Sequence, residues 1–458
     1  MIRNVVLIAI DTLRQDHLGC YGYRRTTSPT IDELARKGVI FLRAYASDVP
    51  TIPSFTSLFT GRRGIKTGIV SHRRDEVLSD EIFWLPEYLA KQGIKTAAVS
   101  TLYFMRKWFS RGFNYYMNPV AGDRRRTQQV DAEEINYYAI RWLKQHKDER
   151  FFLFIHYWDP HMFYKPPSPY SELFYSGNPC DPNNHSLDKL KQCIDWPFRK
   201  RQLDEILPGV TDLEFIIAQY DGEIRYVDDK IKEVIELLEK LRLLEETLVV
   251  ICSDHGESLG EHNVYFDHAD VYEPVIHIPL ILFGSEIPSG KKVKALVQSI
   301  DITPTILDYL GLPLPNDLDG RSLRPLIEGE INSIRNVVYC NQATWTAKRT
   351  MIKGFWKLIK TYDETFWKVP RIELYDLKDD PNETKNLVER RKDLVDSMEL
   401  EMTRWLEENL KGSIDPVKLV VSRGIPALSW VERAYKSMGM LDKWNEWLIR
   451  RKASCIEE

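Results

Sequence analysis

Residues 4–11 read Asn4-Val-Val-Leu-Ile-Ala-Ile-Asp11, an unbroken apolar run that ends in a carboxylate. A run that is apolar on both faces is typical of a strand in a parallel sheet covered by helices on both sides. It is too short for a membrane span, and the charged residues after it, with no small-residue cleavage site, are unlike a signal peptide. The stretch therefore predicts a buried parallel strand with Asp11 at its carboxyl end.

Further apolar runs alternate with helical patterns along the chain. This alternation predicts an α/β fold, a three-layer αβα arrangement with a mainly parallel central sheet. In such sheets ligands bind beyond the carboxyl ends of the strands, so polar residues that follow strands are site candidates. The further predicted strands are 95–100, 151–157, 247–252 and 279–283, and the predicted helices are 30–38, 84–92, 130–146 and 212–241.

The character of the sequence changes along the chain, which predicts three parts. Residues 1–335 form the catalytic α/β domain, in which 168–208 are rich in Pro, Asn, Lys and Asp and indicate a lid or specificity loop. Residues 336–395 carry short strand patterns with turns and predict a small antiparallel subdomain. Residues 396–458 are helical in pattern and rich in Trp, and predict a helical tail.

Composition limits the classes of partner. The 458 residues include 63 Lys+Arg and 67 Asp+Glu, so no overall positive field favours nucleic acid or an anionic membrane. No stretch approaches 18 apolar residues, so no membrane span is predicted, and a cytoplasmic location is expected. The six cysteines lack C-x-x-C spacing, which argues against a zinc ribbon; Cys180 and Cys193 could pair but are expected to be free thiols.

Polar residues that suit ester chemistry gather in four segments. Adjacent Asp and His at a strand end present one oxygen and one nitrogen ligand to a divalent ion. The amino terminus of a helix suits an anionic ester. Each segment alone also allows a structural role, as a helix cap, a turn or an ion-pair network. The segments are Asp11 after the first strand, the hydroxyl-rich Thr51–Arg62, Asp159-Pro-His161 after the third strand, and Asp254-His255 after the fourth, followed by His268.

Taken together, these segments resemble the sulfatase family of the alkaline phosphatase-like superfamily, over about residues 3–390. The resemblance implies a sulfatase-like ester hydrolase with its nucleophile at Thr51 and a divalent metal site. The implied metal ligands are Asp11, Thr51, Asp254 and His255. Further segments that carry the resemblance are 28–39, 220–229, 301–307, 319–323 and 373–381.

The chain departs from the family's pattern at several positions. Sulfatases use a Cys or Ser, oxidised to formylglycine, in a C/S-x-P-S-R context, where this chain has Thr51 and, in place of the Arg, Phe55. Thr12 stands where a second carboxylate follows Asp11, and His268 replaces a later lysine. The lysine of the Gly-Lys-Trp-His signature has no clear counterpart near residues 93–108. A formylglycine hydrate releases sulfate by breaking its C–O bond, which a sulfated threonine cannot do. In a phosphothreonine, by contrast, water can attack phosphorus directly.

The leading hypothesis is therefore a metal-dependent hydrolase of phosphate mono- or diesters, or a phosphotransferase, with a covalent intermediate on Thr51. His161 or His268 would protonate the leaving oxygen and then activate water. Two alternatives stay open: a sulfuric ester hydrolase of arylsulfatase type that tolerates Thr51, and a non-catalytic binding protein on the same scaffold. The substrate is a small-molecule anionic ester, and the residues assigned to bind it are Asp159, Ser54 and Arg62.

The nitrogen ligand favours Mn²⁺ or Zn²⁺ over Ca²⁺, with Mg²⁺ also possible as the divalent metal. One ion is preferred, and a second on Asp159, His161 and His268 is the alternative. The tail carries apolar faces that either pack on the same chain or form a homo-oligomer interface. These faces are Val395, Met398, Met402, Trp405 and Leu406, and then Val431, Ala434, Tyr435, Met438 and Leu441.

Overall fold

The computed structural model describes residues 2–120 and 130–454. Its centre is an eight-stranded sheet in the order β12-β2-β11-β8-β1-β7-β5-β6. β1 pairs in parallel with β7 and β8, whereas β11 runs antiparallel to β8 and β2. The predicted α/β class with a mainly parallel sheet is confirmed. The strands are β1 (Asn4–Ile10), β2 (Val39–Phe41), β5 (Lys95–Val99), β6 (Tyr115–Met117), β7 (Phe151–Tyr157), β8 (Thr247–Cys252), β11 (Leu280–Phe283) and β12 (Lys291–Val293).

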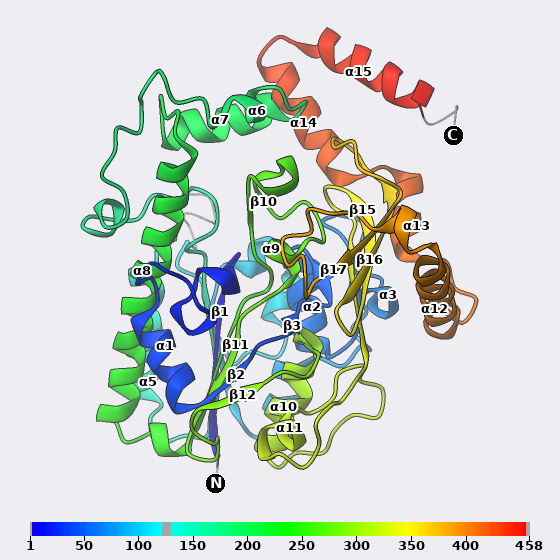
Figure 1. Cartoon of the computed structure of the whole chain (residues 1–458). Coiled ribbons are helices and arrows are strands. Elements are labelled where there is room, and N and C mark those ends of the chain that lie inside the picture. Colours follow the sequence, from blue (N-terminus) through cyan, green and yellow to red (C-terminus); the bar gives the residue numbers. More distant parts are fainter. Residues whose placement is uncertain (1, 121–129, 455–458) are drawn as a thin grey trace.

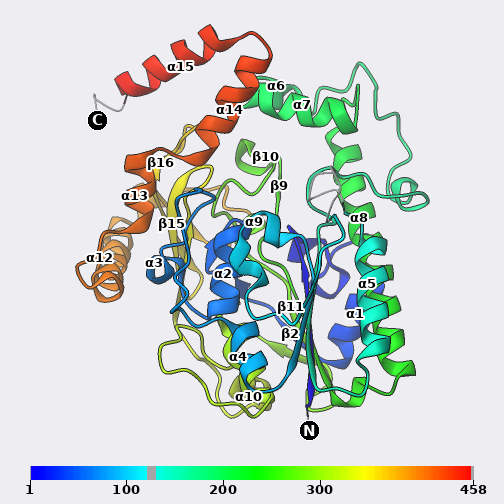
Figure 2. The same cartoon turned by 180° about the vertical axis from the view of Figure 1, so that it is seen from behind.

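Helices cover both faces of this sheet, as the three-layer prediction requires. Figures 1 and 2 show α1 (Pro29–Lys37), α5 (Ala132–Gln145) and α8 (Leu213–Lys240) together on one side. On the other side lie α2 (Thr51–Thr60), α4 (Leu85–Lys91) and α10 (Ile302–Tyr309). The predicted helices among these end within about two residues of the observed ones. The short strands β2, β6 and β12 were not predicted, because three residues carry too little periodicity.

A second sheet contains the C-terminal strands and one early segment. It has the order β17-β16-β15-β14-β4, and its C-terminal strands are antiparallel to one another. β4 (Asp48–Val49) pairs in parallel with β14, so this sheet ends directly before Thr51. The small sheet therefore shares a strand with the segment that leads into α2. Its other strands are β14 (Val337–Gln342), β15 (Ala347–Lys353), β16 (Trp356–Asp363) and β17 (Ile372–Asp376).

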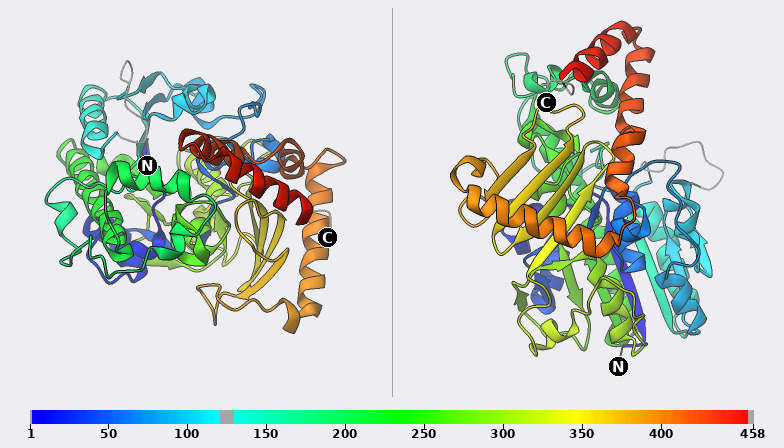
Figure 3. Two further views of the ribbon diagram at one scale, coloured as in Figure 1. Left: turned by 90° about the horizontal axis from the view of Figure 1, so that it is seen from above. Right: turned by 90° about the vertical axis from the view of Figure 1, so that its right-hand side faces the viewer.

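The insertion and the tail meet above the carboxyl edge of the large sheet. α7 (Trp196–Ile206) lies in the insertion, and α14 (Pro426–Ser437) of the tail packs against it (Figures 1 and 3). The remaining elements are β3 (Ala44–Tyr45), α3 (Gly64–Thr67), α6 (Asp188–Lys191), β9 (Ser258–Leu259), β10 (Tyr265–Asp267), α9 (Glu273–Ile276), β13 (Val297–Gln298), α11 (Arg324–Glu328), α12 (Lys392–Leu410), α13 (Pro416–Arg423) and α15 (Leu441–Ser454).

The apolar face of the tail packs on the same chain. Val431 and Tyr435 of α14 are buried in one cluster with Trp345 of the loop between β14 and β15. Met438, which the helical spacing places on the same face, is 45% exposed at the end of α14. This face therefore packs within the same chain, and a homo-oligomer interface through the tail stays a prediction.

Two expectations from composition can be compared with the structure. No helix in residues 2–120 and 130–454 is long and apolar enough to cross a membrane. Cys180 and Cys193 are both free, as expected, and so are the other described cysteines, Cys20, Cys252 and Cys340. Cys455 lies outside the described residues.

A buried ion pair anchors the tail to the small sheet, and it generates the first prediction. Both guanidinium nitrogens Nη1 and Nη2 of Arg349 on β15 donate to Asp415, each at 3.0 Å. Asp415 also caps α13 by accepting from the backbone N–H of Val417. We expect Asp415→Ala to lower the free energy of unfolding by about 3 kcal/mol, because it leaves a buried cation without its carboxylate. Chemical denaturation measures this change.

The matched control is Asp393→Ala in the first turn of α12, where the carboxylate is 77% exposed and lies 3.6 Å from Arg391. This control should leave the unfolding free energy nearly unchanged. Equal effects of the two substitutions would contradict the anchoring role of Asp415.

Candidate active site

The four residues predicted as metal ligands come together at the carboxyl edge of the large sheet. Asp11 follows β1, Asp254 and His255 follow β8, and Thr51 is the first residue of α2. One ligand atom each from Asp11, Asp254 and His255 lie within 4.8 Å of one another. Thr51 Oγ1 lies 3.2 Å from His255 Nε2. All four side chains are buried, so the fold gathers two carboxylates, an imidazole and a hydroxyl in one place.

Backbone contacts fix where the two carboxylates lie. The N–H of Asp11 donates to the carbonyl of Tyr157 at 2.9 Å, which continues the pairing of β1 with β7. Thr12 then turns the chain with a φ of 55°, and its N–H donates to Asp254 Oδ1 at 3.3 Å. Ser54 Oγ on α2 donates to the carbonyl of Asp254 at 2.7 Å. The helix that carries Thr51 is thus bonded to the strand end that carries Asp254.

The hydrogen bonds of His255 leave a lone pair on its Nε2. Its Nδ1 lies 2.9 Å from the carbonyl of Gly256, which assigns the ring proton to Nδ1. Burial keeps the pKa of His255 well below its usual value, so the ring is neutral. Nε2 faces Thr51 Oγ1 and lies 3.2 Å from Asp254 Oδ2. A lone pair against a carboxylate oxygen is an arrangement that a shared cation stabilises.

The electrostatic surroundings of the Asp11 and Asp254 carboxylates also favour a bound cation. Burial raises the pKa of Asp11 well above its usual value, and the nearby Asp254 and Glu257 raise it further. Burial also raises the pKa of Asp254, to about 7. Asp11 Oδ1 and Asp254 Oδ2 are buried and have no hydrogen-bond partner among the described residues. Two orphaned oxygens beside an imidazole nitrogen fit a divalent metal ion, with Thr51 as a fourth ligand.

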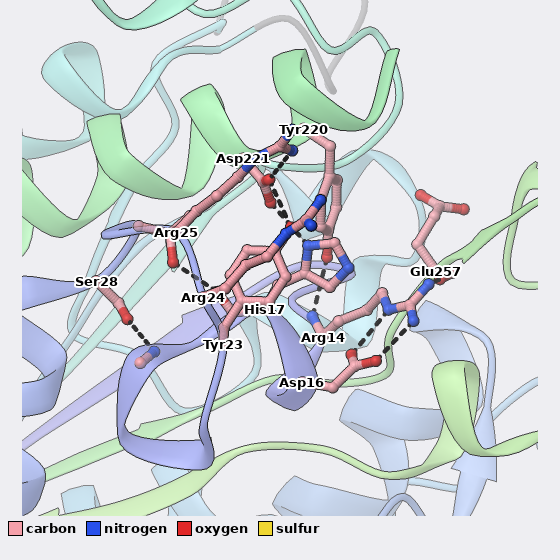
Figure 4. Close-up of polar contacts among 12 residues, drawn as sticks. Arg14, Asp16, His17, Tyr23, Arg24, Arg25, Ser28, Tyr220, Asp221 and Glu257 are labelled. Carbon is pink, nitrogen blue, oxygen red and sulfur yellow. Dashed lines mark hydrogen bonds and ion pairs between the residues drawn. The ribbon is translucent and has the colours of Figure 1, made fainter. Parts of the chain in front are cut away.

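A polar network around Arg14 holds the loop that follows β1 in place (Figure 4). Arg14 Nη1 donates to the carbonyl of Glu257 at 3.1 Å, which joins this loop to the segment after β8. The Tyr220 hydroxyl of α8 accepts from the N–H of Arg14 at 2.9 Å and donates to the carbonyl of Thr12 at 2.8 Å. Further along the loop, His17 Nδ1 lies 2.7 Å from Asp221 Oδ1. These contacts position Asp11 from the side opposite α2.

A cavity of about 300 Å³ opens above Thr51. The candidate catalytic residues His161 and His268 both line it, with ring centroids 5.8 Å apart. The insertion contributes Arg199 and Gln202 of α7. Aromatic and apolar side chains form most of the remaining wall: Met105, Trp158, Met162, Phe163, Phe198, Phe266, Trp345 and Trp430. The structure thus places Thr51 in the wall of a partly open pocket that is also lined by the imidazoles of His72, His161 and His268.

The two histidines in the cavity have opposite electrostatic surroundings. Burial lowers the pKa of His161, and its Nδ1 lies 3.0 Å from the carbonyl of Met162, which leaves a lone pair on Nε2. Burial also acts to lower the pKa of His268, but the carboxylates of Asp267 and Glu257 outweigh it and raise that pKa. His268 is therefore the more readily protonated of the two rings, and His161 the more readily neutral.

Sequence analysis missed a buried cation in the cavity wall. Arg199 Nε donates to Asp195 Oδ2 at 2.9 Å, and its Nη1 pairs with Asp267. Arg199 Nη2 is buried without a hydrogen-bond partner in the described part of the chain. A guanidinium nitrogen of this kind suits an ester oxygen. The insertion carries no motif that could have identified Arg199.

Comparison with known proteins identifies the family. The sulfatase family model matches residues 3–312. The chain belongs to the sulfatase family. A second model, the C-terminal region of N-sulphoglucosamine sulphohydrolase, matches residues 260–411. This sulfatase-family chain is a sulfatase-like ester hydrolase, and enzymes of the family generally depend on a divalent metal.

Individual relatives match most of the chain at low identity. An N-acetylglucosamine-6-O-sulfatase of Bacteroides thetaiotaomicron is 22% identical, over 84% of this chain and 82% of that protein. An arylsulfatase of Clostridium perfringens is 24% identical, over 92% of this chain and 98% of that protein. The structure of BT4656 with its substrate D-glucosamine-2-N,6-O-disulfate has a TM-score of 0.74 at 19% identity, with 91% of this chain and 99% of that chain covered.

A phosphonate monoester hydrolase of Agrobacterium radiobacter has a TM-score of 0.71 at 20% identity, over 89% of this chain and 96% of that chain. These structural likenesses show that the fold is shared.

The residues that depart from the family's pattern have identifiable surroundings in this sulfatase-family chain. Phe55 is fully buried and packs its ring against Phe154 and His156. His156 Nε2 in turn lies 3.4 Å from Asp11 Oδ2. An arginine at position 55 would place a charge in this aromatic cluster, so the chain has apolar packing where the family's pattern has a cation. Arg199 brings a cation to the cavity from a different segment.

Three predicted substrate-binding residues do not line the cavity. Ser54 points to the backbone of Asp254, and Arg62 pairs with Asp317 beyond the far end of α2. Asp159 lies beside Glu223 of α8, and burial raises the pKa of Asp159 to about 6. Their assignment to substrate binding gains no support from these contacts, because sequence spacing does not give the direction of a side chain. A second ion on Asp159, His161 and His268 has no such support, since Asp11, Asp254 and His255 are the ligand cluster found among the described residues.

The ligand cluster generates a prediction about metal binding. We expect Asp11→Asn to weaken Mn²⁺ or Zn²⁺ binding by at least about 100-fold, because it removes one of two ligand carboxylates. Isothermal titration of the metal-stripped protein measures this affinity. Metal should also raise the unfolding temperature of the unsubstituted protein. The control Asp148→Asn neutralises an exposed carboxylate outside the site and should bind metal normally. Equal metal affinity in the two variants would rule out Asp11 as a ligand.

Proposed function

We propose that this chain is a metal-dependent hydrolase of phosphate esters, mono- or diesters, and that Thr51 is its nucleophile. The observation that carries the proposal is the threonine itself at the position where sulfatases have an oxidisable Cys or Ser. Its hydroxyl lies in the cavity wall, 3.2 Å from His255 Nε2. Thr51 also begins α2, whose positive dipole end favours an anion.

The chemistry of the two esters separates phosphate from sulfate. Formylglycine hydrate releases sulfate by breaking its own C–O bond, so water need not attack sulfur. An unmodified threonine has no second hydroxyl on the same carbon and cannot release sulfate by breaking its C–O bond. A phosphothreonine can be hydrolysed by in-line attack of water at phosphorus. Thr51 therefore supports turnover of phosphate esters.

Asp11, Asp254, His255 and Thr51 would hold the metal ion, which lowers the pKa of a bound hydroxyl and polarises an ester oxygen. Thr51 Oγ1 releases its proton to solvent as it becomes a metal ligand. It then attacks phosphorus, and the bond from phosphorus to the leaving alcohol oxygen breaks. His268 donates the proton that the leaving oxygen needs. Water then attacks the phosphothreonine, with His161 Nε2 as the base that accepts its proton. The bond from phosphorus to Thr51 Oγ1 then breaks, which releases inorganic phosphate from a monoester substrate or a phosphate monoester from a diester. Protons from solvent restore the Thr51 hydroxyl and the His268 imidazolium. Arg199 Nη2 faces the non-bridging oxygens throughout.

Sulfate ester hydrolysis is the second candidate function. The names of the relatives favour it: they include an N-acetylglucosamine-6-O-sulfatase and an arylsulfatase that match most of this chain. In that case the site would have to release sulfate from unmodified Thr51 or transfer the sulfuryl group directly to water.

Parallel turnover tests separate the candidates and generate the third prediction. The substrates are p-nitrophenyl phosphate, bis(p-nitrophenyl) phosphate and p-nitrophenyl sulfate, each with Mn²⁺, Zn²⁺, Mg²⁺ or Ca²⁺. We expect at least one phosphate ester to be hydrolysed faster than the sulfate. Thr51→Ala should lower kcat by several orders of magnitude, since it removes the attacking oxygen. Thr51→Ser is the matched control, because it keeps a hydroxyl and should retain measurable turnover.

Preferred turnover of the sulfate would replace the proposal with the second candidate. More than a few per cent of activity in a correctly folded Thr51→Ala protein would reject the nucleophile. An unchanged unfolding temperature establishes that the variant folds.

A further inference from the structure

An open groove of about 1000 Å³ adjoins the catalytic cavity. His72, Met105 and Trp430 line both, so the two spaces meet at these side chains. The groove runs between residues 72–75, residues 104–106 and α14 of the tail. Its floor is close to the nucleophile, because His72 Nε2 accepts a hydrogen bond from the N–H of Ile52, the residue after Thr51.

The groove is rich in arginine and poor in carboxylates. Its lining includes four arginines, Arg73, Arg74, Arg106 and Arg433, and one acidic residue, Asp75. The carboxylate of Asp75 is already paired with Arg73 Nε at 2.8 Å and with Arg423 Nη1 at 3.0 Å. The neighbouring Glu76 accepts hydrogen bonds from Ser71, and burial raises its pKa to about 7. A surplus of positive charge therefore faces the groove.

Two kinds of arginine contribute to this charge. Arg106 is held in place, since its Nη2 donates to the carbonyls of His72 at 3.2 Å and Arg73 at 2.6 Å. Its Nε has no hydrogen-bond partner among the described residues. Arg74 and Arg433 are exposed, and neither has a carboxylate within ion-pair distance in residues 2–120 and 130–454. The groove thus combines one fixed guanidinium with two that are free to bind an anion bidentately.

We propose that the groove binds a second anionic group, carried on a ring of the leaving alcohol of the substrate. The inference rests on the proposed function, in which the scissile ester lies at Thr51. Trp430 stands where cavity and groove meet, and its face suits a sugar or aryl ring. The ring would lie against Trp430. Its scissile ester would point into the cavity, and its sulfate, phosphate or carboxylate would lie in the groove among Arg74, Arg106 and Arg433. The insertion and the tail would then select doubly anionic esters.

A pair of unreactive probes tests the groove independently of catalysis. Benzene-1,3-disulfonate and benzenesulfonate differ by one anionic group, and titration calorimetry on the metal-loaded enzyme measures both. We expect the disulfonate to bind about tenfold more tightly at low ionic strength, with a difference that shrinks as salt rises. The double variant Arg74→Ala/Arg433→Ala should lose this difference and keep its affinity for the monosulfonate. It should also keep kcat for p-nitrophenyl phosphate, because neither arginine lines the catalytic cavity.

The matched control is Arg390→Ala/Lys418→Ala, which removes two exposed cations that do not line the groove. It should bind both probes like the unsubstituted enzyme. Equal affinity of the unsubstituted enzyme for the two probes, or the same loss in the control, would overturn the inference. If no phosphate ester is hydrolysed but the disulfonate preference depends on the two arginines, the proposed function fails and the groove stands.

Discussion

The mutual repulsion of buried carboxylates at the carboxyl edge of the sheet is the constraint on which the active site depends. Burial raises the pKa of Asp11 most, and the nearby carboxylates of Asp254 and Glu257 raise it further. Such a cluster costs free energy unless a cation offsets it. Arg14 does not do so directly, because it donates to the backbone of Glu257 and to the side chains of Asp16 and Glu261. Backbone contacts therefore hold the carboxylates in place, and a metal ion would neutralise them.

The same constraint explains why so many elements converge on one edge. β1 and β8 supply the carboxylates, α2 supplies the hydroxyl, and Tyr220 of α8 fixes the loop between them from the opposite face. β4 ties the start of α2 to the C-terminal sheet, so that sheet bears on the position of Thr51. Side chains of α7 in the insertion and of α14 in the tail line the cavity on the side away from the sheet edge. In the proposed function, the metal ligands and the side chains that select the substrate thus belong to different parts of the chain.

The sequence predicts the metal-ligand cluster better than the side chains of α7 and α14 that line the cavity above it. The main strands, the covering helices and the group Asp11, Thr51, Asp254 and His255 follow from apolar periodicity and from a resemblance with ordered motifs. Arg199 and Trp430 do not, because the first lies in a stretch without periodicity and the second beyond the resemblance.

Glu257 was within reach of sequence analysis, since it follows Asp254-His255-Gly256 directly. Ser54, Arg62 and Asp159 were assigned to substrate binding because spacing places a residue near a strand or helix end but does not give its direction. The antiparallel direction of β11 was also not predicted, because an apolar run looks the same in either orientation.

The central claim is that Thr51 carries the phosphoryl group during turnover. The most direct measurement is acid quenching of the metal-loaded enzyme during steady-state hydrolysis of a phosphate ester, followed by peptide mapping with mass spectrometry. We expect a phosphoryl group on Thr51 that disappears when the substrate is exhausted. An enzyme that hydrolyses the ester at full rate but, after quenching, has Thr51 unmodified and the phosphoryl group on another residue would rule out Thr51 as the nucleophile.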